Sequence, residues 1–184
     1  MKVFLNPGHA PNGMPDPGAV NYTTQLRECD VAKKICDAVE MYLTAAGVEV
    51  VGNLQSDNLY HDSEYDQPCV IDEANNSDAD IFISVHCNAF NEEAHGTEVE
   101  VYEHGGDADK LAHCIKSQIV SALGTTDRGV RERPGLLVLN TTNMPAVLVE
   151  TAFIDEDNDE VLLRTRWDDF ARAIARGVTD YENL

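Results

Sequence analysis

Two histidines and two glutamates in the chain have side chains that could together bind a metal ion and move a proton: His9, Glu28, His86 and Glu150. Two imidazoles and one carboxylate are a common ligand set for catalytic zinc, which keeps a further position for water. A second carboxylate that does not bind the metal can act as a general base. From residue types alone, a hydrolytic site with the first three as ligands and Glu150 as base competes on equal terms with four unrelated structural polar groups.

His9 opens a segment that cannot form regular structure, NPGHAPNGMPDPGAV at residues 6–20. Each of its prolines lacks a backbone donor, and its glycines allow backbone angles that are closed to other residues. We therefore predict an irregular surface loop, a setting that often carries function. A histidine at the mouth of such a loop can equally be an ordinary turn residue.

Glu28 precedes three apolar residues by four, seven and eleven positions, namely Ala32, Ile35 and Val39. At helical spacing these residues share one face, so Glu28 falls on the inward stripe of a helix, near its start. A carboxylate on that stripe is costly unless it is paired or bound to a metal. The alternative is an acid at a helix start that accepts hydrogen bonds from loop amides.

Strands and helices alternate along the chain, which predicts an α/β fold. Apolar runs predict strands at 2–6, 48–53, 81–86, 96–104, 136–139 and 146–150, with 81–86 buried on both faces and 96–104 half exposed at an edge. Helical spacing predicts helices at about 26–46, 68–80, 107–124 and 167–178. We predict one domain over residues 1–184, a mostly parallel, roughly six-stranded twisted sheet with helices on both faces.

In such a sheet, ligands bind beyond the carboxyl ends of the strands. The first strand leads to His9, the third is expected to end at His86, and the last is expected to end at Glu150. If these strands are parallel and adjacent, the fold gathers the three side chains at one edge of the sheet.

The remaining histidines, His61, His95, His104 and His113, are interpreted as surface or packing residues. The five cysteines, Cys29, Cys36, Cys69, Cys87 and Cys114, contain no C-x-x-C pair and predict neither a disulfide framework nor a structural zinc ribbon. We interpret them as small buried thiols of a reducing compartment.

Composition narrows the function classes. The formal charge of −20 disfavours nucleic acid and anionic membrane surfaces as partners, because binding would bring like charges together. No apolar run approaches the roughly 20 residues needed to cross a bilayer, and no signal peptide is visible after Met1. We expect a monomer that is made in the cytoplasm.

The chain resembles the amidase 3 family of zinc-dependent N-acetylmuramoyl-L-alanine amidases, which cut peptidoglycan. The resemblance rests on four stretches in order, NPGHAPNGMPDPGAV, LRECDVAKKICDAV, IFISVHCNAF and PAVLVETAFIDEDND, with support from DEANNSDAD, GTEVEVY, DRGVRE and ARAIARGVTDY. Two positions depart from the family pattern. Asn6 stands where an acidic residue is usual, and Val70 stands where an arginine often precedes the alanine–asparagine pair.

The resemblance implies that His9, Glu28 and His86 bind Zn²⁺ and that Glu150 is the catalytic carboxylate. The substrate it implies is peptidoglycan, cut at the amide that joins N-acetylmuramic acid to L-alanine of the stem peptide. Two alternatives stay open: a zinc peptidase that acts within the stem peptide, and a domain that binds wall fragments without cutting them. A phage lysin, a spore enzyme and a bacterial autolysin would share this sequence pattern, and each would act on the wall after release or export by another route.

Overall fold

The computed structural model describes residues 1–60 and 67–184. The helices and strands that hold the sheet together are β1 (Lys2–Pro7), α1 (Glu28–Ala45), β4 (Glu49–Asn53), α2 (Val70–Asn76), β5 (Ile81–Asn88), β6 (Thr97–Val101), α3 (Asp107–Leu123), β7 (Asp127–Glu132), α4 (Leu137–Asn140), β8 (Ala146–Phe153), α5 (Asp157–Thr165) and α6 (Trp167–Glu182). Between β1 and α1 lie a short 3₁₀ turn, η1 (Pro11–Gly13), and a small hairpin of β2 (Val20–Asn21) and β3 (Leu26–Arg27). Within the described ranges, we find no helix with both the length and the apolar character to cross a membrane.

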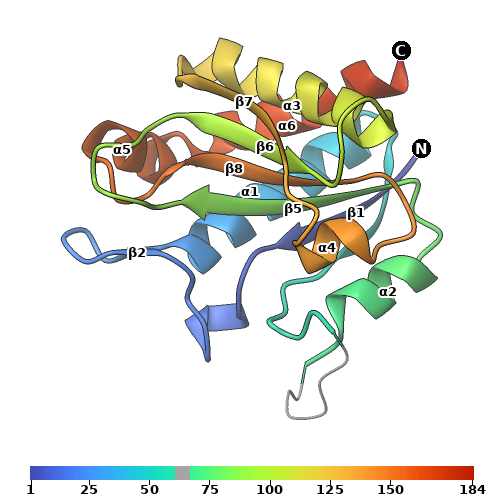
Figure 1. The fold of residues 1–184 in the computed structure, drawn as a ribbon, viewed down its shortest axis with the longest axis horizontal. Helices are drawn as coiled ribbons and strands as arrows, with labels where there is room; N and C mark the ends of the chain where they lie inside the picture. Colours follow the sequence, from blue (N-terminus) through green and yellow to red (C-terminus); the bar gives the residue numbers. More distant parts are fainter. Residues whose placement is uncertain (61–66) are drawn as a thin grey trace.

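The central sheet has the strand order β4-β1-β5-β8-β6-β7. All neighbouring pairs are parallel except β6 with β8, which is antiparallel. The prediction of a mostly parallel, six-stranded α/β sheet is therefore confirmed. Figure 1 shows the strands side by side across the molecule, with β5 and β8 at the centre.

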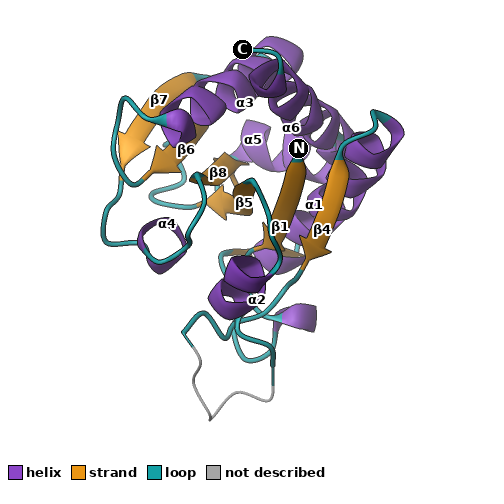
Figure 2. Cartoon of the chain, turned by 90° about the vertical axis from the view of Figure 1, so that its right-hand side faces the viewer, coloured by secondary structure: helices purple, strands orange, loops and turns teal. Residues whose placement is uncertain are grey.

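One face of the sheet is covered by the three long helices. Figure 2 shows α1, α3 and α6 together on this side, and α6 packs against both other helices. The odd-numbered strand residues, such as Val3, Ile83 and Val149, are fully buried beneath them and form the main core. The helices bury stripes of Ile, Val, Leu and Ala, which is why the spacing of apolar residues predicts them well.

On the opposite face of the sheet, the side chains change from apolar to polar along the strands. Phe4, Phe82 and Leu148 form a smaller core with the short helices α2 and α4. Val70, which departs from the family pattern, is fully buried in this core, so an apolar contact anchors α2. Further along the same face, the even-numbered positions become polar, beginning with Ser84.

Two strand predictions are wrong. Residues 96–104 are not a half-exposed edge: β6 lies between β8 and β7, and all its residues are buried. Residues 136–139 are not a strand, because α4 begins at Leu137 and Asn140 donates its backbone N–H to Leu136 O. A short apolar run does not distinguish a strand from a buried helical turn.

The edge strand next to β6 is β7, whose sequence DRGVRE is too polar to predict a strand. The helix α5 was also not predicted. The strands β5 and β8 continue past His86 and Glu150 to Asn88 and Phe153, so these two residues lie within strands and do not end them.

Candidate metal centre

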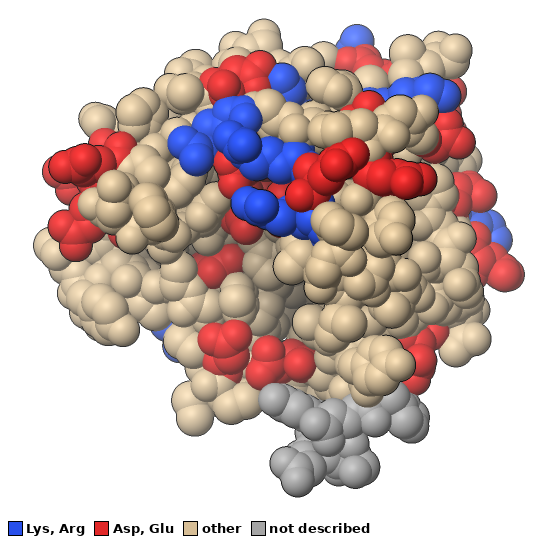
Figure 3. Space-filling view, in the orientation of Figure 1, with Lys and Arg blue, Asp and Glu red and all other residues tan. Residues whose placement is uncertain are grey.

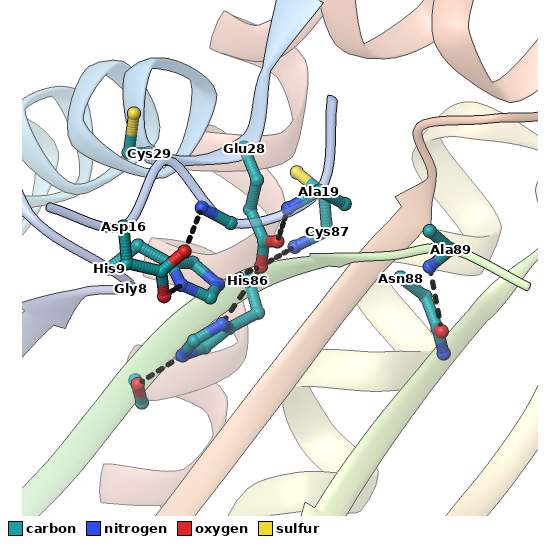
Figure 4. A network of polar contacts seen from close by, with 12 residues as sticks. Gly8, His9, Asp16, Ala19, Glu28, Cys29, His86, Cys87, Asn88 and Ala89 are labelled. Atoms are coloured by element: carbon teal, nitrogen blue, oxygen red, sulfur yellow. Dashed lines mark hydrogen bonds and ion pairs between the residues drawn. The ribbon is translucent and has the colours of Figure 1, made fainter. Parts of the chain in front are cut away.

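Glu28 lies between His9 and His86, as Figure 4 shows. Its Oε1 atom is 3.0 Å from His9 Nε2 and 2.9 Å from His86 Nδ1. One ligand atom from each of the three residues lies within 4.8 Å of the others. The structure thus brings together the three residues predicted as metal ligands, although they are separated by up to 77 positions in the chain.

The start of α1 places Glu28 in the interior. It is the first residue of the helix and is only 4% exposed. Its Oε2 atom accepts a hydrogen bond from Ala19 N at 2.8 Å, and Oε1 accepts one from Cys87 N at 3.0 Å. The carboxylate therefore accepts hydrogen bonds from a loop amide and a strand amide, as the helix-start alternative predicts, and it also faces the two histidines.

Glycine permits the close approach of loop and strand. A Cβ atom on Gly18, whose φ is +70°, would lie 2.5 Å from both Glu28 Oε2 and His9 Cδ2. A Cβ atom on Gly8 would lie 2.3 Å from His86 Cε1. Both distances are shorter than real contacts allow, so only glycine at these positions leaves room for the three ligand side chains.

Asp16 fixes the orientation of the His9 ring. The Asp16 Oδ2 atom lies 2.7 Å from His9 Nδ1, and Oδ1 accepts a hydrogen bond from Gly18 N at 2.9 Å. This contact holds the ring so that Nε2 is directed at Glu28. Carboxylates that hold metal-binding histidines in this way are common partners of metal sites.

Ser84 and Asn6 fix the His86 ring. Ser84 Oγ donates to Asn6 Oδ1 at 2.8 Å, so its own lone pair accepts from His86 Nε2 at 3.1 Å. The Asn6 amide is in turn oriented because Nδ2 donates to Leu54 O at 2.9 Å. This chain holds the His86 ring with Nδ1 directed at Glu28, and it gives a function to the unusual Asn6.

The electrostatics of the cluster favour an ionised Glu28. Burial alone would raise the pKa of Glu28, but the hydrogen bonds with His86 and His9 outweigh it and hold the pKa far below the ordinary range. Burial would lower the pKa of His9, yet its contacts with Glu28 and Asp16 raise it to about 9. Glu28 therefore supplies a fixed negative charge between two histidine rings.

The donor set and its spacing fit a zinc ion. Zinc bonds of about 2.0–2.1 Å at tetrahedral angles place ligand atoms about 3.3 Å apart. The two separations that involve Glu28 Oε1 are 2.9 and 3.0 Å, so only a small outward movement of the side chains is needed. The rings of His9 and His86 meet edge to face, with centroids 5.0 Å apart, which lets both nitrogens converge on one point.

Glu150 lies next to this cluster on the adjacent strand. It is the register partner of His86 in the β5–β8 pair. Its Oε2 atom is buried and has no hydrogen-bond partner among the described residues. Burial, together with the charges of Glu28, Glu100 and Glu98, raises the pKa of Glu150 well above the ordinary carboxyl value. This carboxyl therefore holds a proton more tightly than a free glutamate does.

The other titratable candidates lie elsewhere. His95, His104 and His113 are exposed, as predicted, and His61 falls outside the described residues. Four of the five cysteines are buried, and Cys114 is partly buried. Burial raises the pKa of the Cys87 thiol well above its usual value, so this residue beside His86 is not a reactive thiolate.

The supporting roles of Asp16 and Ser84 are not predicted from sequence, and Asn6 is singled out there only as a departure from the family pattern. The spacing of Ser84 and His86 was an available signal, because residues two apart in a strand share a face. Asp16 gave no such signal, since only the fold of the loop brings it to His9.

Comparison with known proteins agrees with this geometry. The family described as N-acetylmuramoyl-L-alanine amidase matches residues 3–180. The chain is 32% identical over 184 residues to N-acetylmuramoyl-L-alanine amidase LytC of Bacillus subtilis (strain 168), a match that covers 97% of this chain and 35% of LytC. The chain thus spans about a third of the length of that relative.

Solved structures resemble this fold over almost its whole length. The N-acetylmuramoyl-L-alanine amidase from Clostridium difficile 630 has a TM-score of 0.83 and 31% identity, with 99% of this chain and 96% of that chain covered. AmiC2 of Nostoc punctiforme, also an N-acetylmuramoyl-L-alanine amidase, has a TM-score of 0.85 and 28% identity, with 100% and 98% covered.

Proposed function

The chain belongs to the amidase 3 family of N-acetylmuramoyl-L-alanine amidases, and from this premise we propose that it hydrolyses peptidoglycan with the help of a zinc ion. The proposed ligands are His9, Glu28 and His86, and the proposed catalytic residue is Glu150. The bond cut is the amide between the lactyl group of N-acetylmuramic acid and L-alanine of the stem peptide.

One observation carries the catalytic part of this proposal. The buried Glu150 carboxylate has an oxygen with no partner in the described chain, directly across from His86. Leaving a buried polar atom without a partner costs about 1–3 kcal/mol. A carboxylate kept in that condition beside a metal-ligand cluster is available to bind a water molecule or a substrate proton.

The residues of the chain have distinct roles in this reaction. When bound, zinc supplies Lewis acidity toward the scissile carbonyl and lowers the pKa of water. Glu150 takes a proton from the attacking water and delivers it to the L-alanine nitrogen as the carbon–nitrogen bond breaks. Its raised pKa makes the ionised carboxylate a stronger base toward the proton of the water. Asp16 and Ser84 hold the two histidine rings in place throughout.

The Ser84 contact gives a prediction about metal affinity. Ser84→Ala removes the hydroxyl that contacts His86 Nε2, so the ring loses a contact that fixes its orientation. We expect zinc affinity to fall about 10- to 100-fold, the usual effect of losing such a supporting partner. Titration with a competing chelator measures this, and the exposed Ser121→Ala serves as control. Native zinc affinity in Ser84→Ala would show that the serine does not hold His86.

Removal of the metal tests the proposal as a whole. We expect about one zinc per chain in the purified protein, loss of peptidoglycan hydrolysis on chelation, and recovery when zinc is returned. Full activity in metal-free protein would contradict the proposed chemistry. Zinc binding with no hydrolysis of any wall fragment would favour a domain that only binds the wall.

Further parts of the proposal concern the setting in which the chain acts. We propose that residues 1–184 form one catalytic domain that works as a monomer on the cell wall, after release or export by another route. Neither nucleic acid nor membrane is part of the proposal, because the charge of −20 disfavours both.

A further inference from the structure

A group of arginines lies beside the candidate site in a strongly acidic protein. Arg128 and Arg131 belong to β7, and Arg133 follows it. Figure 3 shows Lys and Arg side chains gathered over β6 and β7, next to a hollow in the molecular surface. The chain has only 13 basic residues against 33 acidic ones, so a local concentration of positive charge is unusual for it.

Two buried carboxylates of β6 anchor these arginines. Glu98 Oε2 accepts hydrogen bonds from Arg128 Nε at 2.8 Å and from Arg131 Nε at 3.1 Å. Glu100 Oε1 accepts one from Arg133 Nε at 3.0 Å. Glu98 and Glu100 are only 4% and 6% exposed, so the anchors are fixed within the sheet.

The contacts with Glu98 and Glu100 leave the Nη groups of two of these arginines available to bind a ligand. Among the described residues, Arg131 and Arg133 donate side-chain hydrogen bonds through Nε alone. Their side chains are 46% and 52% exposed, so the Nη groups reach solvent. Arg128 is more enclosed, since its guanidinium lies 4.8 Å from the centre of the Phe153 ring. Arg131 and Arg133 are therefore the two that can take a ligand.

The sheet register ties this group to Glu150. Glu98 is the register partner of Glu150 across the β6–β8 pair, and Glu150 is the partner of His86. Neighbouring strands lie about 4.8 Å apart, so the Cα atoms of Glu98 and His86 are roughly 10 Å apart. On β7, the next strand toward the edge of the sheet, Arg131 is the register partner of Glu100 of β6. Arg131 reaches back to the line of His86, Glu150 and Glu98 through its contact with Glu98, and Arg133 lies further along β6 against Glu100.

Charge indicates which part of the substrate meets these arginines. In the proposed reaction the lactyl carboxyl is consumed in the scissile amide, and the acetamido sugars carry no charge. Anionic groups of the substrate are therefore carboxylates of the peptide. A guanidinium group with free Nη donors binds a carboxylate with matching geometry. An extended peptide advances about 3.3–3.6 Å per residue, so the roughly 10 Å between His86 and Glu98, the residue that Arg131 contacts, corresponds to about three residues beyond the cut bond.

We propose that Arg131 and Arg133 bind a free carboxylate of the stem peptide and so position the leaving-amine side of the substrate. This inference rests on the proposed amidase function and adds a determinant of substrate choice to it. Amidation of the peptide carboxylates would then make a substrate poorer without changing the bond that is cut.

A matched pair of substrates tests the proposal. One is an N-acetylmuramoyl tripeptide with free carboxylates, and the other is the same molecule with every peptide carboxylate converted to a carboxamide. We expect zinc-loaded wild-type protein to prefer the free acid by at least about tenfold in kcat/KM. Arg131→Gln should lower kcat/KM for the free acid by about 10- to 100-fold, the range for a lost hydrogen bond between charged groups. It should leave the amidated substrate within about twofold.

Arg164→Gln is the matched control. Arg164 on α5 also donates through Nε to a buried glutamate, Glu160, at 2.9 Å, and its side chain is 49% exposed. We expect this variant to behave as wild type on both substrates. Equal rates of the wild type on the two substrates, or an equal loss on both in Arg131→Gln, would overturn the proposal and leave Arg131 a structural role.

Binding of the free tripeptide separates this proposal from the proposed function. If the wild type cleaves neither substrate, the amidase proposal fails, while calorimetry with the tripeptide still decides whether Arg131→Gln weakens binding. Unchanged binding would overturn the role of Arg131. A variant that loses affinity only for walls bearing anionic polymers, with unchanged kcat/KM, would also overturn it and assign the arginines to those polymers.

Discussion

Replacing Glu150 with glutamine is expected to lower the rate of amide hydrolysis by about 10²- to 10⁴-fold while zinc content and folding stay near normal. The carboxamide keeps the size of the side chain but cannot take the proton of the attacking water. Glu150 is not one of the three clustered ligand residues, so the metal should remain. Burial raises the pKa of the wild-type carboxyl, and the neutral amide avoids that cost, so stability should not fall.

The measurement combines turnover on peptidoglycan, zinc content and melting temperature for the same samples. Glu103→Gln, a change at an exposed position outside the cluster, serves as the control and should match the wild type in all three. A Glu150→Gln protein that turns over at the native rate would remove Glu150 from the reaction. Loss of zinc from this variant would make Glu150 a ligand.

Glu28→Gln should give the opposite pattern, with loss of metal as the primary effect. The substitution removes the one negative charge among the three proposed ligands and disturbs a carboxylate that contacts both histidines. We expect zinc affinity to fall by at least about tenfold. At free zinc about 100 times the native Kd, binding stabilises the fold by about 2.7 kcal/mol, and a tenfold loss removes about 1.3 kcal/mol of this. For a chain of this length, the melting temperature in zinc should fall by about 3–5 °C.

The shift in melting temperature must be compared with and without zinc, because Glu28 also accepts hydrogen bonds from Ala19 and Cys87. A loss that is the same in both conditions would come from those contacts alone. If Glu28→Gln keeps its metal and Glu150→Gln loses it, the assignment of ligand and base is reversed. Glu28 would then be only an acid at a helix start.

The sequence predicts those parts of the fold in which apolar spacing is regular. The stripe of Ala32, Ile35 and Val39 locates α1, and the continuous apolar run of β5 locates a strand buried on both faces. Prediction from apolar spacing fails where contacts between strands override the local sequence pattern. The edge strand β7 is too charged to be recognised, yet its arginines are stabilised by Glu98 and Glu100 on the neighbouring strand.

The four candidate site residues could be chosen from sequence because they lie at expected strand ends and on the inward stripe of α1, and because four stretches in order resemble the amidase 3 family. Their supporting contacts could not be chosen. Asp16 reaches His9 through the path of an irregular loop, and Asn6 reaches His86 through Ser84. Such links depend on register and loop geometry, which residue spacing alone does not determine.

Analysis of the reaction products tests the central proposal most directly. Purified peptidoglycan is incubated with the zinc-loaded protein, and the new amino termini and new reducing sugar ends are identified and counted. The proposed function predicts L-alanine as the new amino terminus, with glycan strands left intact. New amino termini from residues further along the stem peptide would indicate a zinc peptidase, and new reducing ends would indicate a glycosidase; either result would contradict the proposal.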